Sequence, residues 1–559
     1  MDILKFLHFK KKSMYKSILL IAAGCFFSIS LLAQRDTTKQ SISITSSFKP
    51  VLRNAVKINF SGSQLLADTA TSVKPYIIPA QNLFYAYQPI ALKPLALQQD
   101  TNLYLGGRNF VKAGFGNYST PYAQAGLSFG NGKTSLVNLY GSYISSKGKI
   151  KNQDYVQFVG KASGSYFAKK FEVYGSASVS QNRYFLYGYD HSLYDFKKDE
   201  VKQHLQDITI KAGIRNTAIN EYRISYNPNV ELNLFSNVDK LNETTIIVNA
   251  PVEKKFGDNF TVKVEAKGDF TNYYTKGFIP NNYNFSNNVI QVSPSLVYYS
   301  PKFSINGGIS PTWNNSKFVW LPNVYAEYQL QEKVFSVQAG WVGRYIKNTY
   351  RNLSSMNPYL SPLTSQTNTK EVEFYGGIKG SLGKHFNFNA KAGFVSYDDY
   401  QFFINDTSGV AAAGKSFVTV NDRRVKNFRV RGDLGYIIQD KFSATAGITF
   451  NGYTGMKDND KAWNTVPVEI NGSVRWWAFK QVLLKADFYA YGSGYYLEPG
   501  NVSHSFKPGT DLSAGVEFKF TKQLSAWLDV NNIFNNKYER WHNYQVYGLN
   551  LMGGVRFDF

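Results

Sequence analysis

The chain has 559 residues, carries a formal net charge of +23, and combines 18% charged with 16% aromatic residues. After residue 33 no apolar run approaches the roughly 20 residues of a spanning helix, and no composition break divides the chain after about residue 102. These features exclude a helical membrane protein and a series of linked soluble domains. The six scattered histidines and the single cysteine predict no metal site, no cofactor and no disulfide.

The first 33 residues have the layout of a signal peptide. Lysines between residues 10 and 16 precede the apolar stretch 18–32, which is too short to span and anchor, and Ala33 follows it. We expect cleavage after Ala33, which removes the single cysteine, Cys25. The alternative is a lipoprotein signal that ends at Cys25, although its apolar part is then short. We therefore predict an exported protein.

Residues 34–102 precede the first predicted strand of the main fold. Between residues 73 and 98, prolines are spaced through apolar and aromatic residues, which favours an extended, polyproline-like path. The segment is too apolar for a solvated tail. We expect it to line or thread the lumen of a barrel as a reduced plug, or to dock a partner protein. The candidate lumen-filling residues are Tyr76, Ile78, Phe84, Tyr85 and Tyr87.

Regularly alternating segments begin at about residue 103. In 260–270, 482–490 and 512–520, apolar residues alternate with polar or charged ones, as in a strand with one apolar face. No amphipathic helix of useful length accompanies them, which makes a large soluble all-β protein the weaker alternative. The 40 tyrosines and 42 phenylalanines suit the two aromatic girdles of a membrane barrel.

Short connections, nearly all with a lysine, alternate with longer polar ones along this region. The longer stretches are 182–207, 273–288, 348–370, 397–427, 452–464 and 492–510. Outer-membrane barrels have short periplasmic turns and longer external loops, so the pattern predicts a transmembrane antiparallel β-barrel of about 22 strands over residues 103–559. It would span a Gram-negative outer membrane with both ends in the periplasm. Pro228, Pro251, Pro294 and Pro322 lie inside proposed strands and predict bulges or unpaired positions there.

The chain ends inside one more alternating strand, 547–559 (YGLNLMGGVRFDF). An unpaired strand edge must be covered, and closure into a barrel removes edges altogether. Val555, Phe557 and the terminal Phe559 share one face of this strand. We expect these three residues to form the signal that the barrel-assembly machinery reads.

The segment 528–538 (LDVNNIFNNKY), together with the terminal strand, resembles the end of the TonB-dependent outer-membrane receptors. That family also has 22-stranded barrels. The resemblance implies a non-enzymatic protein for solute uptake across the outer membrane, with TonB as a partner. Members usually carry a larger globular plug than residues 34–102 allow, so a reduced or missing plug is expected. The stretch 41–45 (SISIT) is too common a pattern to identify a TonB box.

Two other functions stay open at this point. One is an accessory or scaffold subunit of an outer-membrane protein complex, and the other is a passive porin. The basic lysines lie in turns and on polar strand faces rather than in one stripe with stacking aromatics, so nucleic acid is not an expected partner. Outer-membrane lipid and lipopolysaccharide are the expected ones. We also expect charges in 263–269 and 429–433 to pair across neighbouring strands.

Overall fold

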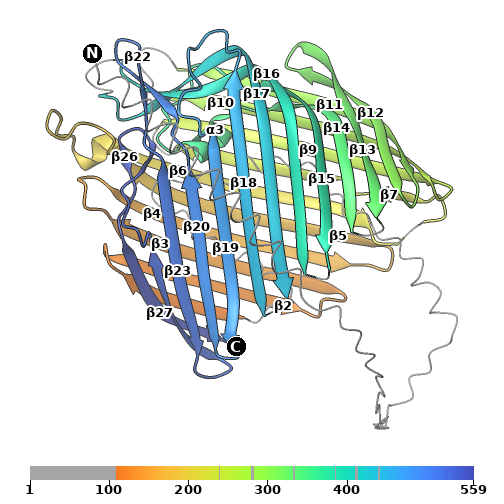
Figure 1. Cartoon of the computed structure of the whole chain (residues 1–559), viewed down its shortest axis with the longest axis horizontal. Coiled ribbons are helices and arrows are strands. Elements are labelled where there is room, and N and C mark those ends of the chain that lie inside the picture. The colour runs from red at the N-terminus through yellow and green to blue at the C-terminus, as the bar shows by residue number, and fades with distance from the viewer. Residues whose placement is uncertain are drawn as a thin grey trace, which may run out of the picture. The chain divides into compact units, whose positions relative to one another are not determined.

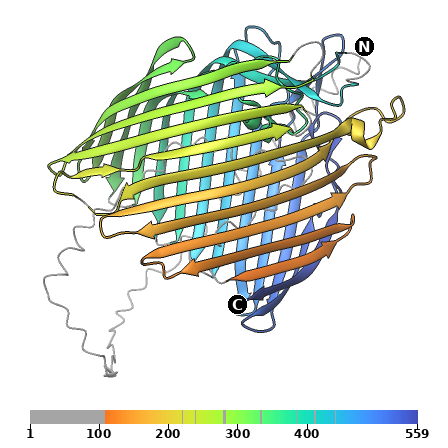
Figure 2. The same cartoon turned by 180° about the vertical axis from the view of Figure 1, so that it is seen from behind.

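The computed structural model describes residues 109–559, apart from 219, 238–239, 278–281, 332–333, 384, 409–412 and 439–440. This part of the chain forms one antiparallel β-barrel (Figure 1, Figure 2). The predicted signal peptide, 1–33, and the predicted lumen segment, 34–102, lie outside the described residues.

The wall strands alternate in direction and follow chain order. Their bounds are β1 Phe110–Gly116, β2 Thr120–Gly130, β3 Ser135–Lys147, β4 Asp154–Phe167, β5 Phe171–Phe185, β6 Lys202–Asn216, β7 Ile224–Tyr226, β8 Asn229–Asn237, β9 Leu241–Phe256, β10 Phe260–Thr275, β11 Asn284–Tyr299, β12 Phe303–Asn314, β13 Lys317–Gln331, β14 Phe335–Ile346, β15 Thr369–Leu382, β16 Phe386–Asn405, β17 Phe417–Ile438, β18 Phe442–Thr454, β19 Val468–Phe479, β20 Val482–Tyr491, β23 Gly509–Lys519, β24 Leu524–Asn531 and β27 Asn550–Asp558.

The remaining elements belong to connections between wall strands. They are the hairpins β21 Tyr495–Glu498 with β22 Val502–Ser505 and β25 Glu539–Trp541 with β26 Tyr544–Gln545, a 3-10 helix over Lys198–Val201, and the helix α3 over Tyr350–Met356. No helix in the described part of the chain is long and apolar enough to cross a membrane.

The barrel closes where its first strand meets its last. β1 pairs with β27 from Phe110 opposite Asp558 to Gly116 opposite Met552, and the backbone N–H of Phe559 donates to the carbonyl of Asn109 at 2.9 Å. The sheet holds 23 strands, of which β7 and β8 together fill one position between β6 and β9, so the wall has 22 positions. The predicted strand number and the pairing of the terminal strand are confirmed.

Each of the prolines flagged in the sequence lies at an interruption of a strand ladder. Pro228 lies in the break between β7 and β8, and Pro251 of β9 lies opposite that break. Pro294 lies in a gap of the β11–β12 ladder, and Pro322 directly precedes the first paired residues of β13 and β14. Proline has no N–H to donate, so it occupies positions where one neighbour is not hydrogen-bonded.

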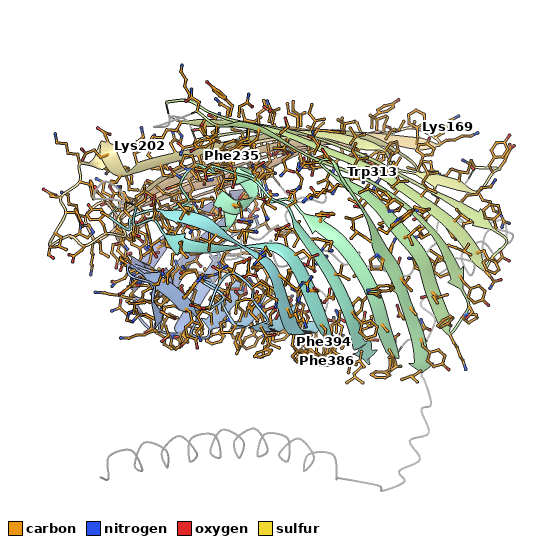
Figure 3. All side chains as sticks on the ribbon, turned by 90° about the horizontal axis from the view of Figure 1, so that it is seen from above. Lys169, Lys202, Phe235, Trp313, Phe386 and Phe394 are labelled. Atoms are coloured by element: carbon orange, nitrogen blue, oxygen red, sulfur yellow. The ribbon has the colours of Figure 1, made fainter. Side chains whose placement is uncertain are left out.

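The two faces of the wall differ as the alternation predicts. Along β10, Phe260, Val262 and Val264 are exposed on the outer face, while Thr261, Thr271 and Tyr273 are buried on the inner one. Figure 3 shows the same contrast, with Phe394 on the outer side of the wall and Phe235 on the inner side near α3. The outer face is therefore the surface that meets lipid.

The connections at the two rims of the barrel differ in length. The short-turn rim holds both ends of the barrel and every second connection, namely those that follow β2, β4, β6, β9, β11, β13, β15, β17, β19 and β23. The long-loop rim holds the other connections. Several wall strands continue into segments that the sequence predicts as loops. For residues 397–427, β16 continues to Asn405 and β17 begins at Phe417, with Tyr400 paired to Asp422. Beyond the membrane a strand needs no apolar outer face, so the period-two pattern fades while the pairing continues.

The rims can be assigned by labelling single cysteines in intact cells. Leu193, in the long loop after β5, is 73% exposed, whereas Lys522 lies in a short turn. A membrane-impermeant thiol reagent should label L193C and reach K522C only after the outer membrane is broken. The reverse pattern would invert the topology. Sequence alone places Asn357 in an external loop, but its side chain is 0% exposed, so N357C should stay unlabelled in both conditions.

Candidate functional site: a loop cap inside the barrel mouth

The connection between β14 and β15 folds into the barrel instead of standing above it. We call these residues, 347–368, the cap loop; its helix α3 lies inside the wall near the long-loop rim (Figure 1, Figure 2). Thr349 is the N-cap of α3, and its hydroxyl accepts a hydrogen bond from the N–H of Asn352 at 3.2 Å. Tyr350 and Leu353 are buried, so α3 packs its apolar side into the structure.

Charged groups fasten the first part of the cap loop to the wall. The ammonium of Lys347 donates to the carboxylate of Asp269 at 2.6 Å, to the hydroxyl of Thr271 at 2.6 Å and to the carbonyl of Asn287 at 2.9 Å. These partners lie on β10 and β11. The ammonium is thus fully surrounded by acceptors, which is what a buried cation requires.

The first turn of α3 is held by a second buried charge. The carboxylate of Glu243 on β9 accepts hydrogen bonds from the backbone N–H of Tyr350 at 2.8 Å and of Arg351 at 3.1 Å. These N–H groups have no partner within the helix, and a carboxylate at a helix N-terminus also interacts favourably with the helix dipole. The guanidinium of Arg351 in turn pairs with Asp207 on β6 at 2.9 Å.

The later part of the cap loop reaches β17 while it stays hydrogen-bonded to β6, since the side-chain amide of Gln203 donates to the carbonyl of Leu360 at 3.2 Å. Leu360 forms a parallel bridge with Phe417, the first residue of β17. The N–H of Ser361 donates to the carbonyl of Phe417 at 2.8 Å, and the N–H of Phe417 donates to the carbonyl of Tyr359 at 3.0 Å. The cap loop is therefore attached at β6–β11 on one side and at β17 on the other.

Three loops meet at a tyrosine triad above this bridge. Tyr187 comes from the loop after β5, Tyr359 from the cap loop, and Tyr544 from β26. The rings of Tyr359 and Tyr544 stack at 3.5 Å between centroids, and Tyr187 meets Tyr544 edge-on at 4.8 Å and Tyr359 at 6.1 Å. All three side chains are fully buried. We call these packed loops together the cap.

Further aromatic side chains surround the triad and join it to the wall. The buried cluster includes Tyr155, Tyr184, Tyr273, Tyr350, Phe403, Phe417, Trp541 and Tyr547. Burial raises the pKa of the Tyr359 and Tyr544 phenols well above their usual value and that of Tyr350 to about 12. The phenols therefore stay neutral at physiological pH, and closure of the cap involves no titrating phenol.

Buried polar atoms without a partner lie in the cap and on the wall strand β16 beside it. The amide nitrogen of Asn357, the indole nitrogen of Trp541 and the amide oxygen of Asn405 are buried and make no hydrogen bond among the described residues. A buried unsatisfied group costs about 1–3 kcal/mol. The closed cap is therefore held by strong contacts, although some of its buried polar atoms lack a hydrogen-bond partner.

The inner wall carries closely matched charges of both signs. Lys263 on β10 pairs with Glu253 on β9 at 2.9 Å, which confirms one predicted pair between neighbouring strands. Arg429 on β17 instead reaches Glu371 on β15 at 3.2 Å, past the intervening β16. Other wall pairs are Lys379–Glu327, Arg475–Asp487 and Lys485–Asp529. Such pairs leave little net charge on the lumen surface.

The predicted site residues have different outcomes. Val555 and Phe557 of β27 and the terminal Phe559 are exposed on the outer face at the short-turn rim. Tyr76, Ile78, Phe84, Tyr85 and Tyr87 lie outside the described residues, and their packing in the lumen stays a prediction. Within the described part of the chain, no group of histidine, cysteine or acidic side chains is arranged to hold a metal ion.

Sequence reasoning missed the cap. Residues 348–370 are correctly predicted as a connection, but not as one that turns inward. A signal was present, because Tyr350 and Tyr359 are large aromatics in an otherwise polar loop, and Tyr544 and Tyr547 repeat this in another loop. An external loop without a packing partner has no need of such residues.

No protein-family model matches this chain, and no match is found among curated proteins. Solved structures do match. The FrpB iron transporter from Neisseria meningitidis superposes with a TM-score of 0.63 at 12% identity, covering 82% of this chain and 83% of that chain. The chain has the barrel fold of the TonB-dependent outer-membrane receptors.

Other transporters and receptors share this barrel. The ferric-catecholate import receptor Fiu from Escherichia coli K12 matches with a TM-score of 0.60 at 11% identity, over 82% of each chain. The copper transporter OprC matches with a TM-score of 0.59 at 10% identity, over 81% of this chain and 83% of that chain. The resemblance seen in the terminal residues is thereby confirmed at the level of the fold, and such a barrel fits an outer membrane.

Proposed function

We propose that this protein is a receptor-like transporter that moves a solute across the outer membrane through its barrel, with the cap as the outer gate. The closed cap supports this proposal most directly. In the mouth, the cap loop bridges to β17 at Leu360 and Phe417, and three loops meet at the tyrosine triad. A passive porin needs an open lumen, so a packed mouth favours a gated pathway.

The unsatisfied polar atoms support a gate over a permanent seal. Asn357, Asn405 and Trp541 would each gain hydrogen bonds to water or to a ligand if the cap loop moved. The strong anchors at Lys347 and Glu243 are confined to one side of the cap loop. We therefore place the hinge at the β9–β11 wall and the opening at the bridge to β17.

Energy coupling belongs to the same proposal. TonB is the proposed partner on the periplasmic side, and residues 34–102 are the proposed inner obstruction, with Tyr76, Ile78, Phe84, Tyr85 and Tyr87 against the wall. The support for this part is the resemblance of the barrel fold and the composition of that segment. The alternative is an accessory or scaffold subunit, whose barrel stays closed while its surfaces bind other outer-membrane proteins.

A cysteine pair can test transport even while the solute is unidentified. Bridged residues such as Leu360 and Phe417 have the backbone proximity that a disulfide requires. The only native cysteine is Cys25, in the predicted signal peptide. Cells that produce the L360C/F417C variant should stop depleting the transported solute from a complex medium, and a reductant should restore depletion. The single variants are the controls.

Two outcomes would speak against the proposal. If cells with the oxidised pair deplete the same solutes as wild-type cells, the cap is not a transport gate. If neither depletes any solute, and stable partner proteins co-purify in mild detergent, the scaffold alternative holds. Loss of depletion in cells without TonB tests energy coupling separately.

The assembly signal is a further proposal. Phe559 extends the closing seam, and Phe557 pairs across it with Val111. Deleting Phe559 should lower the amount of folded barrel in the outer membrane severalfold at an unchanged transcript level. The control is Phe129→Ala, which removes an exposed aromatic near the same rim but away from the chain end. If both variants assemble in equal amounts, Phe559 is not part of the assembly signal.

A further inference from the structure

The positive charge of the barrel is unevenly distributed between its two rims. The short turns hold several exposed lysines, including those at positions 133, 169, 170, 302, 480 and 522. In the described residues of these turns the acids are Glu221 and Asp258, and Asp258 pairs with the neighbouring Arg223 at 3.7 Å. Figure 3 shows Lys169 at the edge of the wall. We call these six lysines the lysine ring.

The opposite rim mixes both signs. Ion pairs at this rim are Lys151–Asp195, Lys198–Asp154 and Arg423–Asp458. The inner wall between the rims is balanced by its own pairs, such as Lys379–Glu327 and Lys485–Asp529. In the described residues, basic side chains therefore outnumber acidic ones more strongly in the short turns than in the loops of the opposite rim.

Exposed aromatic side chains accompany the lysine ring. Phe129 precedes the turn of Lys133, Tyr166 and Phe171 flank Lys169 and Lys170, Phe479 precedes Lys480, and Phe520 precedes Lys522. Nearby, the ammonium of Lys254 lies 5.1 Å from the centre of the Phe256 ring, and that of Lys519 lies 4.1 Å from Trp477. Outward aromatics with lysines just beyond them mark the level at which acyl chains give way to headgroups.

We infer that the lysine ring binds the phosphate groups of anionic phospholipids in the periplasmic leaflet. A lysine near an anionic membrane surface attracts its headgroups, and several lysines act together. Five of the six residues come from turns between β19 and β5 on either side of the closing seam, and Lys302 comes from the turn between β11 and β12. The outward aromatics beside four of the five turns also favour lipid.

The test compares two variants that lose equal charge. The ring variant carries Lys→Gln at positions 133, 169, 170, 302, 480 and 522, and the control variant carries Lys→Gln at positions 149, 197, 276, 457, 461 and 537 in loops of the opposite rim. Each protein is reconstituted in vesicles of equal parts phosphatidylglycerol and phosphatidylethanolamine and extracted with its bound lipid. Headgroup analysis should show about threefold enrichment of phosphatidylglycerol on the wild type and the control variant.

The ring variant should fall to the bulk ratio, and wild-type enrichment should decrease at high salt, which screens exposed charges. Equal enrichment on all three proteins, or equal loss in both variants, would overturn the inference. So would loss of an acidic partner protein from the ring variant while its lipid is unchanged. If the ring variant does not fold, variants that carry three of its six substitutions take its place. In these variants the logarithm of the phosphatidylglycerol enrichment should fall by about half.

Discussion

Deleting the cap loop and residues 73–98 together should convert the closed barrel into a large channel. In planar bilayers the double deletion should raise single-channel conductance by roughly an order of magnitude over the wild type, because a barrel of 22 strands otherwise encloses a wide lumen. Cells that produce it should become sensitive to large antibiotics that the outer membrane excludes. The cap loop is replaced from 349 to 367 by a short glycine-serine turn between β14 and β15.

The single deletions separate the two obstructions. If the cap and the proposed lumen segment block the barrel in series, each single deletion should conduct little and only the double deletion should open it. A large conductance after cap deletion alone would show that residues 73–98 do not fill the lumen. A closed double deletion would contradict both assignments and place the obstruction in other loops. Heat-modifiable migration on gels verifies that each variant still forms a barrel.

Replacing Lys347 by methionine should release the cap loop from its wall. The substitution leaves the carboxylate of Asp269, which is largely buried, without its cation. Breaking one partner of a buried pair destabilises by about 3 kcal/mol or more, and about 3 kcal/mol raises the open fraction roughly 100-fold. Hydrogen exchange of the amides in residues 349–361 should accelerate by a similar factor, while exchange in β10 and β11 stays slow.

Two comparisons make this result specific. The double variant K347M/D269N removes the unpaired carboxylate as well, so it should recover part of the protection. Arg423→Gln breaks an exposed pair with Asp458. It should change the free energy of opening of the cap loop, measured by hydrogen exchange, by less than about 1 kcal/mol. If K347M exchanges like the wild type, the hinge is not at Lys347 and the anchor at Glu243 must hold the cap loop alone.

The barrel could be predicted from sequence because its determinants are local. In lipid every backbone group must pair with a neighbouring strand, so alternation, turn spacing and the terminal strand together decide the architecture. Residues 260–270 became β10 with the predicted faces, and the chain closed through β27. The prolines at 251, 294 and 322 were correctly predicted as defects of pairing, because the missing N–H is a property of the residue itself.

The extent of the strands was harder to predict. Residues 397–427 do not alternate regularly between apolar and polar residues, so their pattern does not distinguish a strand from a loop. In the structure most of them belong to β16 and β17, which pair with each other and bury Phe402, Phe403 and Phe417. Similarly, the net charge could be counted from composition, but its distribution between the two rims depends on which connections are turns.

Local sequence patterns were sufficient to predict the membrane barrel and its strand number, because each follows from a period or a spacing that neighbouring residues share. The candidate site depends instead on contacts between distant parts of the chain. Tyr187, Tyr359 and Tyr544 lie far apart in sequence, and nothing local to any of them predicts their stacking. The partners of Lys347 likewise come from strands more than fifty residues away. Distant loops can contact one another only inside the mouth of the barrel. This enclosed space exists only once the barrel has closed.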